Sequence, residues 1–393
     1  MRFVLINGES NYNALRNHIV ELGSALEELG HEVFTLDFVT GGTKEVMREA
    51  IKAQIHGFVA FNAMACDAVV GDEPLFDALD TPYITCLVDH PAYHWESLDQ
   101  RLKKYTVMAL DHSHVRFLER FFDHDHFSAV GYLPTGATTT LSDTDFGESW
   151  LEERDISIFF SGSMRPTAQR AWREFGENTL TSLLDDAVDL ALSEETLCFD
   201  DALDAALKEF SFALAPKHRK WLAMNTIVAH NYIETFRRQA LMKTLSEAEV
   251  PVTIVGKGWE PVMNEYRSFK WLGEGNVTET ASLMKRSRIV LNSNNNFTEG
   301  AHERVFAAQA SGAAVLSDAS TAYEAEYKDE KEILYYRWQR LNELPSKIEG
   351  ILNAPEKLSQ IAAGGWRIMR ERHSWKARAR KIVEISQIIA AVD

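Results

Sequence analysis

The stretch 292–300 and the residues that follow it have the side-chain types that bind a phosphate. Asparagine, serine and threonine are frequent there, and the stretch follows the apolar strand pattern RIVL. The next residues, AHERVFAAQASG, predict a helix that begins near Ala301. A helix N-terminus favours an anion, and Arg304 in the first turn would add a bidentate contact to a phosphate. The candidate ligands in this segment are Asn294, Asn296, Glu299, Gly300, His302, Glu303 and Arg304.

Packing alone explains part of this segment. Ala301, Val305, Ala308 and Gly312 fall on one face of the predicted helix, where small residues permit close contact with a sheet. Packing does not explain the run of asparagines before the helix. We therefore interpret the loop as a binding site and the apolar face of the helix as its support.

Two further loops combine glycine with a cation directly after an apolar strand pattern. They follow the segments ISIFFS and PVTIV. Small residues let the backbone approach a phosphate closely, and a side-chain cation can neutralise its charge. The second loop is interpreted equally well as a tight turn with an exposed lysine. The residues concerned are Gly162, Ser163 and Arg165 in the first loop and Gly256, Lys257 and Trp259 in the second.

Asp89 and His90 follow the strand pattern YITCLV, and Pro91 ends it. A carboxylate beside an imidazole can act as a proton acceptor near neutral pH. The alternative, which the pattern alone favours, is a turn in which Asp89 caps a helix. Two other clusters, DHSH at 111–114 and DHDH at 123–126, have metal-ligating side chains. The second is flanked by phenylalanines in a polar stretch, so we interpret these clusters as solvated loops and predict no metal site.

Alternating strand and helix patterns must position these residues. The strand RFVLIN is followed by leucines and an isoleucine at helical spacing, then Gly30 and the strand HEVFTLDF, which together predict a parallel βαβ unit. The pattern recurs along the first half and predicts a Rossmann-like domain. Ligands bind beyond the carboxyl ends of such strands, where the loops 7–11, 62–64 and 89–91 would meet.

The acidic segment 141–155 lacks a long apolar period and predicts a domain boundary. We expect an N-terminal domain over residues 1–150 and a C-terminal domain over 151–374. Residues 167–248 predict several helices, and the apolar stretch from 375 to 393 predicts a last helix.

Composition excludes several classes of protein. Lys and Arg number 41 and Asp and Glu 58, a net charge of −17 that disfavours binding to nucleic acid or to an anionic membrane surface. Three cysteines are too few for a disulfide framework. No apolar run reaches the ~20 residues of a membrane span, so we expect no stable membrane insertion. The segment MRFVLING predicts a strand rather than a signal peptide, and we expect a cytoplasmic protein.

The segment GAHERVFAAQASGAAVLSD at 300–318 resembles the donor-binding signature of GT-B glycosyltransferases. It is most similar to the CgeB-type (spore-maturation-protein-like) group, which includes candidate protein and flagellin glycosyltransferases. Four further segments match in the same order: VDHPAYH (88–94), YLPTGAT (132–138), FFSGSMR (159–165) and TIVGKGW (253–259).

The resemblance implies an α/β protein with two Rossmann-like domains facing a cleft and a helical insertion in the C-terminal half. The C-terminal domain would hold a nucleotide-sugar and the N-terminal domain an acceptor, with the last helix crossing back onto the N-terminal domain. The implied reaction moves a sugar to a hydroxyl group of a glycan or of a protein such as flagellin, with no metal and no cofactor. Arg304, Lys257 and Arg165 would stabilise the leaving group, and Asp89 or His90 would serve as the base of an inverting reaction.

One departure from the family pattern leaves the stereochemistry open. Many retaining GT-B enzymes have two glutamates eight positions apart, and Glu299 matches the first whereas Ala307 occupies the place of the second. The ribose contact would then come from another residue such as Glu303. Two alternative functions remain: a GT-B nucleotide-sugar epimerase and a non-enzymatic nucleotide-sugar binding protein.

Overall fold

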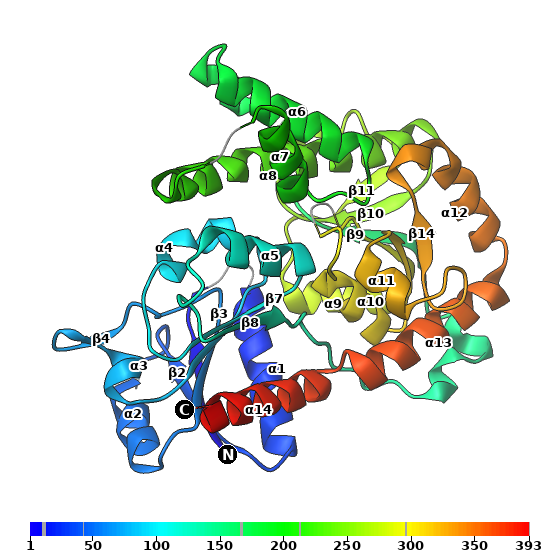
Figure 1. Ribbon diagram of the computed structural model, residues 1–393. Coiled ribbons are helices and arrows are strands. Elements are labelled where there is room, and N and C mark those ends of the chain that lie inside the picture. The colour runs from blue at the N-terminus through cyan, green and yellow to red at the C-terminus, as the bar shows by residue number, and fades with distance from the viewer. Residues whose placement is uncertain (10–12, 42, 166–167, 212–213, 295–296, 393) are drawn as a thin grey trace. The chain divides into compact units, whose positions relative to one another are not determined.

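The structure is a computed structural model that describes residues 1–392 apart from 10–12, 42, 166–167, 212–213 and 295–296 (Figure 1). The chain divides into two compact units, one formed by Met1–Thr138 with Arg372–Asp393 and the other by Thr139–Glu371. Each unit contains its own six-stranded sheet. This is the predicted class, a protein of two parallel α/β domains.

The first unit is built on a parallel sheet in the order β2-β1-β3-β6-β7-β8. Helices cover the sheet on both faces, which explains why β1 and β3 lack polar alternation. The strands are β1 (Arg2–Asn7), β2 (Glu32–Asp37), β3 (Gly57–Phe61), β6 (Tyr83–Cys86), β7 (Tyr105–Ala109) and β8 (Ala129–Tyr132), with a small hairpin of β4 (Val69–Val70) and β5 (Glu73–Pro74). The helices are α1 (Ala14–Glu28), α2 (Thr43–Lys52), α3 (Leu75–Ala78), α4 (Trp95–Leu98) and α5 (His112–Phe121).

The C-terminal helix α14 (Trp375–Val392) belongs to this first unit and lies beside α1 (Figure 1). Trp375, Ala379 and Ile382 are buried in a core with residues of β1 and β3. Gly136 permits the contact, because a Cβ atom there would lie 2.8 Å from the backbone nitrogen of Trp375. Arg378 fixes the entry to the helix by donating to the carbonyl oxygen of Thr135 over 3.1 Å.

The second unit has a parallel sheet in the order β11-β10-β9-β12-β13-β14. Its strands are β9 (Ile156–Ser161), β10 (Val252–Val255), β11 (Phe269–Trp271), β12 (Ser287–Leu291), β13 (Ala314–Asp318) and β14 (Leu334–Tyr336). The helical block predicted at 167–248 consists of α6 (Thr179–Ser193), α7 (Phe199–Glu209) and the long α8 (Pro216–Glu247). The other helices are α9 (Val277–Lys285), α10 (Glu303–Ala310), α11 (Thr321–Glu326), α12 (Leu344–Leu352) and α13 (Pro355–Arg372).

The acidic segment 141–155 lies in the second unit, so the division at Thr138 precedes the boundary predicted at residue 150. The reason is that two side chains of this segment are core residues of the second unit. The Trp150 indole donates to the carbonyl oxygen of Gly312 over 2.9 Å. Arg154 donates to the carbonyl oxygens of Ser287 and Ser311 over 2.7 and 2.9 Å, which ties the start of β12 to the end of α10.

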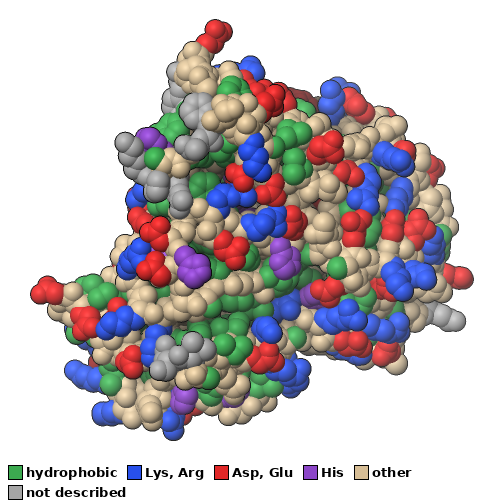
Figure 2. Space-filling view, in the orientation of Figure 1, with side chains coloured by type: hydrophobic (Ala, Val, Ile, Leu, Met, Phe, Trp, Pro, Cys, Tyr) green, Lys and Arg blue, Asp and Glu red, His purple; other side chains and the backbone are tan. Residues whose placement is uncertain are grey.

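Acidic and basic side chains are interspersed over the face of the molecule seen in Figure 2. No helix in the described part of the chain is both long enough and apolar enough to cross a membrane.

Candidate functional site

The order of the strands in the second unit identifies where a ligand would bind. The chain runs outward from β9 through β10 to β11, then returns to β12 on the other side of β9. Ligands of open parallel sheets bind beyond the carboxyl ends of the strands at this switch point. The loops after β9 and β12 meet there, and they contain the predicted phosphate ligands.

The loops after β9 and β10 pack directly against each other, which requires glycine. Gly162 donates its N–H to the carbonyl oxygen of Val255 over 2.9 Å. A Cβ atom on Gly256 would lie 2.2 Å from the carbonyl oxygen of Gly162, and one on Gly258 would lie 2.0 Å from that of Met164. The Trp259 indole is fully buried and donates to Gly162 over 2.7 Å. These glycines and Trp259 therefore shape the loop, whereas the Lys257 ammonium is exposed, 3.6 Å from the Glu274 carboxylate.

Arg304 in the first turn of α10 reaches the end of β9. Its Nε donates to the Ser161 hydroxyl over 3.1 Å, and its Nη1 donates to the Asn292 side-chain oxygen over 2.7 Å. Its remaining Nη2 lies 3.6 Å from the Cβ position of Gly162. Burial lowers the pKa of Arg304 to about 10, so the group stays cationic at neutral pH. Two hydrogen bonds thus hold a cation against the glycine loop.

His302 is the N-cap of α10 rather than an exposed ligand. Its Nδ1 accepts the backbone N–H of Arg304 over 3.1 Å, and burial lowers the pKa of the imidazole to about 3. Its own N–H donates to the Tyr323 hydroxyl over 2.7 Å. Two of the N–H groups at this helix start are therefore satisfied inside the protein.

Asn294 holds the shape of the predicted phosphate loop. Its side chain is buried and donates to the carbonyl oxygen of Gly300 over 3.3 Å, and its backbone N–H donates to the Asp318 carboxylate over 2.6 Å. Burial raises the pKa of Asp318 to about 6. Glu299 and Glu303 are half-buried at the rim of the loop, while Asn296 lies outside the described residues.

Arg238 on α8 is a second cation at this site. Its Nη1 donates to the carbonyl oxygen of Ser163 over 2.7 Å, and its guanidinium lies 5.9 Å from the Phe160 ring, which Arg304 approaches to 5.5 Å. The Glu234 carboxylate forms ion pairs with Arg238 over 2.9 Å and with Arg165 over 3.3 Å, so one carboxylate holds two of the arginines. The charge of Arg238 helps to lower the pKa of Arg304, which means that the two cations repel each other.

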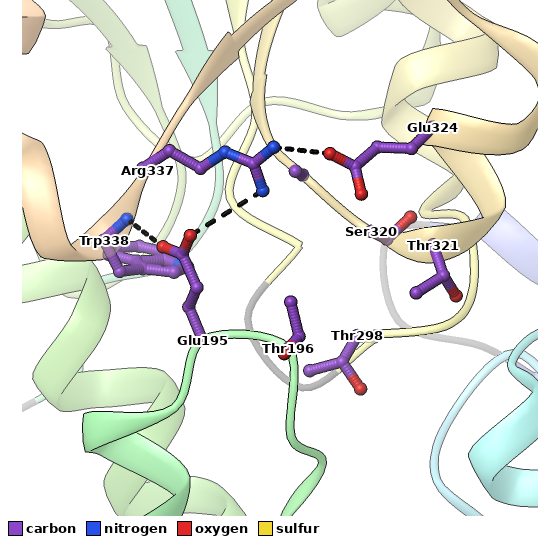
Figure 3. A pocket seen from close by; sticks show the side chains of 9 residues that line it. Glu195, Thr196, Thr298, Ser320, Thr321, Glu324, Arg337 and Trp338 are labelled. Atoms are coloured by element: carbon purple, nitrogen blue, oxygen red, sulfur yellow. Dashed lines mark hydrogen bonds and ion pairs between the residues drawn. The ribbon is translucent and has the colours of Figure 1, made fainter.

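A small pocket lies beside the Thr298–Gly300 loop, at the carboxyl ends of β13 and β14 (Figure 3). Arg337 bridges Glu195, from the connection between α6 and α7, and Glu324 of α11. The backbone N–H of Trp338 donates to Glu195 over 2.8 Å. The Thr298 hydroxyl also lines the pocket, is buried, and has no hydrogen-bond partner among the residues that the structure describes. Hydroxyl, carboxylate and guanidinium groups thus surround one polar pocket.

In the first unit the side chains of Asp89 and His90 have different surroundings. His90 is 4% exposed, accepts the backbone N–H of Ala92 over 3.2 Å and stacks edge-on against His114 and Phe117. The Asp89 side chain is 55% exposed, and His94 rather than His90 is its imidazole neighbour, with His94 Nε2 3.5 Å from the carboxylate.

Asn62 holds the Asp89 carboxylate from the neighbouring strand end. Its side-chain nitrogen donates to Asp89 over 2.9 Å, and its side-chain oxygen accepts the N–H of Val88. Asn62 and Ala63 both have positive φ, 51° and 53°. Such a backbone conformation is uncommon outside glycine and often occurs at functional sites.

The two histidine clusters of the sequence have structural roles in this unit, and the prediction of solvated loops is wrong for Asp111, His114 and His126, which are buried. Asp111 is the N-cap of α5 and accepts the N–H of Ser113 over 2.7 Å. His126 hydrogen-bonds to the carbonyl oxygen of Leu98 over 2.7 Å, and Asp123 pairs with Arg101.

Sequence reasoning missed Arg238, Asn292 and His94. Arg238 is adjacent to Arg237 in a segment interpreted only as helical, and its partner Ser163 is 75 residues away. Asn292 belongs to the asparagine run, but its role depends on Arg304, 12 residues further along the chain, which donates to its side-chain oxygen. The histidine of the VDHPAYH segment that faces Asp89 is the second one, and the helical turn over Pro91–His94 brings it there.

Comparisons with known proteins bear on the family and on the fold. Residues 237–384 match the family model described as "Glycosyl transferase-like". The search of curated proteins found no match. Sucrose-phosphate synthase from Thermosynechococcus elongatus is similar over 100% of both chains, with 11% identity and a TM-score of 0.54.

Two further solved structures have the same fold. AviGT4, a glycosyltransferase involved in avilamycin A biosynthesis, is similar over 100% of this chain and 99% of its own, with 11% identity and a TM-score of 0.52. HepE from Anabaena, in complex with UDP and glucose, covers 98% and 99% with 12% identity and a TM-score of 0.50. The chain therefore has the GT-B fold of two Rossmann-like domains, and its residues 237–384 are similar to glycosyl transferases.

Proposed function

We propose that this protein is a glycosyltransferase that moves a sugar from a nucleotide-sugar donor to a hydroxyl group of an acceptor. The observation that carries the proposal is the pair of cations, Arg304 and Arg238, at the switch point of the second sheet. Two guanidinium groups that repel each other form a favourable site for the phosphates of a donor. The similarity of residues 237–384 to glycosyl transferases supports the same conclusion.

In the proposed reaction the bond between the sugar and the diphosphate oxygen breaks, and the acceptor oxygen forms the new bond to the sugar. Negative charge then develops on the leaving nucleotide. Arg304, fixed by Ser161 and Asn292, and Arg238 would stabilise that charge without a metal ion. In an inverting reaction the acceptor proton would pass to Asp89, the exposed carboxylate held by Asn62.

The pocket beside Thr298 has a volume of only about 10 Å³, so it supports polar contacts to the edge of the donor's sugar and does not enclose the sugar. It adjoins the loop that leads into α10, and its lining groups can donate to and accept from sugar hydroxyls. The resemblance to the CgeB-type group favours an acceptor on a protein such as flagellin or on a surface glycan. A cytoplasmic location is expected for such an enzyme.

A thermal-shift screen with UDP-, GDP-, dTDP- and CMP-linked sugars tests the proposal. A donor that binds only the native state raises the melting temperature. We expect a shift with one of these donors in the wild type and in Arg267→Gln, an exposed arginine outside the site, and a much smaller shift in Arg304→Gln. Equal shifts in all three proteins would contradict a donor site at Arg304.

Product analysis separates the alternatives. A nucleotide-sugar epimerase would rearrange the sugar when incubated with the donor alone, whereas a transferase releases nucleotide and modifies an acceptor. A binding protein would bind the donor and release no product. The proposal predicts nucleotide release that depends on Arg304.

A further inference from the structure

An open groove lies at the edge of the second sheet, away from the switch point. It is bounded by α11, the edge strand β14 and the start of α12, which lie together in Figure 1. Its volume is about 730 Å³, within the range of roughly 300–1,000 Å³ of ligand sites. We call it the edge groove. The groove is therefore large enough for a small molecule.

Four cations and three carboxylates line the edge groove, and most of them neutralise one another. Arg337 pairs with Glu324. Lys347 pairs with Asp329 over 3.2 Å and donates to the carbonyl oxygen of Tyr335 over 2.7 Å. These pairs hold the walls of the groove together and leave three charged side chains for a ligand.

The three remaining groups are Lys328, Arg340 and Glu343. All three are exposed, and none forms an ion pair or a side-chain hydrogen bond with any residue that the structure describes. Two unpaired cations against one carboxylate give the groove a net positive charge, although the whole chain carries −17. An unpaired Arg and an unpaired Lys in one concave site favour a phosphate over a neutral ligand.

The start of α12 closes one end of the groove, where Glu343 and Leu344 line it. A 3₁₀ turn over Trp338–Glu343 leads directly into the helix, and the N–H of Leu344 donates to the carbonyl oxygen of Leu341. The preference for an anion therefore depends on Lys328 and Arg340.

The floor of the groove disfavours a nucleobase. Tyr335 and Tyr336 are buried, and their hydroxyls donate to the carbonyl oxygens of Tyr327 and Asn292. They form a closed floor and offer no exposed ring face for stacking. The Glu343 carboxylate, in contrast, can accept hydrogen bonds from hydroxyl groups.

We propose that the edge groove binds a sugar phosphate, with the phosphate on Arg340 and Lys328 and the sugar hydroxyls on Glu343. The edge groove shares Glu324 and Arg337 with the pocket beside Thr298, but none of its lining residues belongs to the loops after β9, β10 or β12, where the phosphates of a donor would bind. The proposed ligand would bind in addition to the donor. It belongs to the same chemical class as the glycosyl phosphate part of a nucleotide-sugar.

Calorimetric titration with glucose 6-phosphate tests this assignment, with glucose and inorganic phosphate as comparison ligands. The test variant is Lys328→Ala with Arg340→Ala. The matched control is Lys285→Ala with Arg267→Ala, which removes one exposed Lys and one exposed Arg of the same unit that also form no ion pair within the described chain. Arg304→Gln reports on the donor site.

We expect saturable binding of glucose 6-phosphate by the wild type, weaker binding of phosphate and no binding of glucose. Loss of two charged contacts should raise the Kd at least about tenfold in the test variant. The Tm should not change, because both side chains are exposed. The matched control and Arg304→Gln should bind like the wild type. Absence of saturable binding, equal weakening in the control, or loss only in Arg304→Gln would overturn the proposal.

Discussion

At the scale of single residues, Asp89 and His90 have different roles. The Asp89 carboxylate is exposed, whereas the buried His90 caps the helical turn over Pro91–His94. The side-chain oxygen of Asp89 faces Asn62 and His94, whereas the His90 ring is enclosed by His114 and Phe117. A base must reach its substrate, so accessibility assigns the role to Asp89.

Substitution of each residue should therefore have a different effect. Asp89→Asn keeps an acceptor for Asn62 but removes the base, and we expect transfer to fall by about 10²- to 10⁴-fold with an unchanged Tm. His90→Ala should lower Tm, because the Ala92 N–H loses its acceptor, at a cost of about 1 kcal/mol. Initial rates and melting curves of both variants measure this. Near-wild-type transfer by Asp89→Asn would exclude Asp89 as the base.

His302 predicts a pH dependence of stability. Burial lowers the pKa of its imidazole from 6.5 to about 3, so below pH 6.5 the unfolded chain takes up a proton that the folded chain does not. Stability is therefore lost as the pH falls from 6.5 towards 3, by about 2 kcal/mol at pH 5. His302→Asn keeps a capping side chain and should reduce this loss. Urea unfolding of both proteins at pH 5 and pH 7 measures it, and an equal loss in the two would contradict the assignment.

Sequence reasoning proposed Arg304 as a ligand because its position in the first turn of a helix is a local feature. The sequence alone could not show which neighbouring residues would bind a ligand and which only stabilise the loop and the helix. Asn294 and His302 have the same residue types as ligands, but their hydrogen bonds are directed into the loop and the helix start. Arg238 was missed because no local spacing links α8 to the loop after β9.

At the scale of elements, Arg154 joins parts of the second unit that are distant in sequence. Its guanidinium satisfies carbonyl groups at the end of α9, the start of β12 and the end of α10. Arg154→Met would leave these carbonyl groups buried without donors, and we expect a loss of about 3 kcal/mol of unfolding free energy. Arg286→Met, which removes an exposed pair with Asp155, should cost less than about 1 kcal/mol. Equal losses in urea unfolding would contradict this account.

The contact between Gly136 and α14 predicts a second effect at this scale. A Cβ atom at Gly136 would meet the backbone of Trp375 at 2.8 Å, where neither partner is a flexible side chain. Gly136→Ala should displace the start of α14, lower the Tm and expose the Trp375 indole to a fluorescence quencher. Gly131→Ala is the control, because its new Cβ would meet the flexible side chain of Met108. Identical quenching in both variants would show that Gly136 does not position the helix.

Strand and helix patterns predicted most elements of both sheets, because buried parallel strands are continuous apolar runs separated by amphipathic helices. The three helices between β9 and β10 were predicted as a helical block but not individually. The position of the division at Thr138 depends on where Trp150 and Arg154 are buried, and an acidic stretch in the sequence does not reveal that.

At the scale of the whole molecule, the first and last segments of the chain form one unit and the middle forms the other. The GT-B fold follows from this arrangement and from the two parallel sheets. The central claim concerns one place in the second unit, where the loops after β9 and β12 and the start of α10 surround Arg304.

A crystal structure of the chain with a nucleoside diphosphate tests that claim most directly. Our account predicts phosphate oxygens within hydrogen-bond distance of the Arg304 guanidinium and next to the Gly162–Ser163 backbone. A nucleotide bound elsewhere, with Arg304 contacting only Ser161 and Asn292, would contradict it.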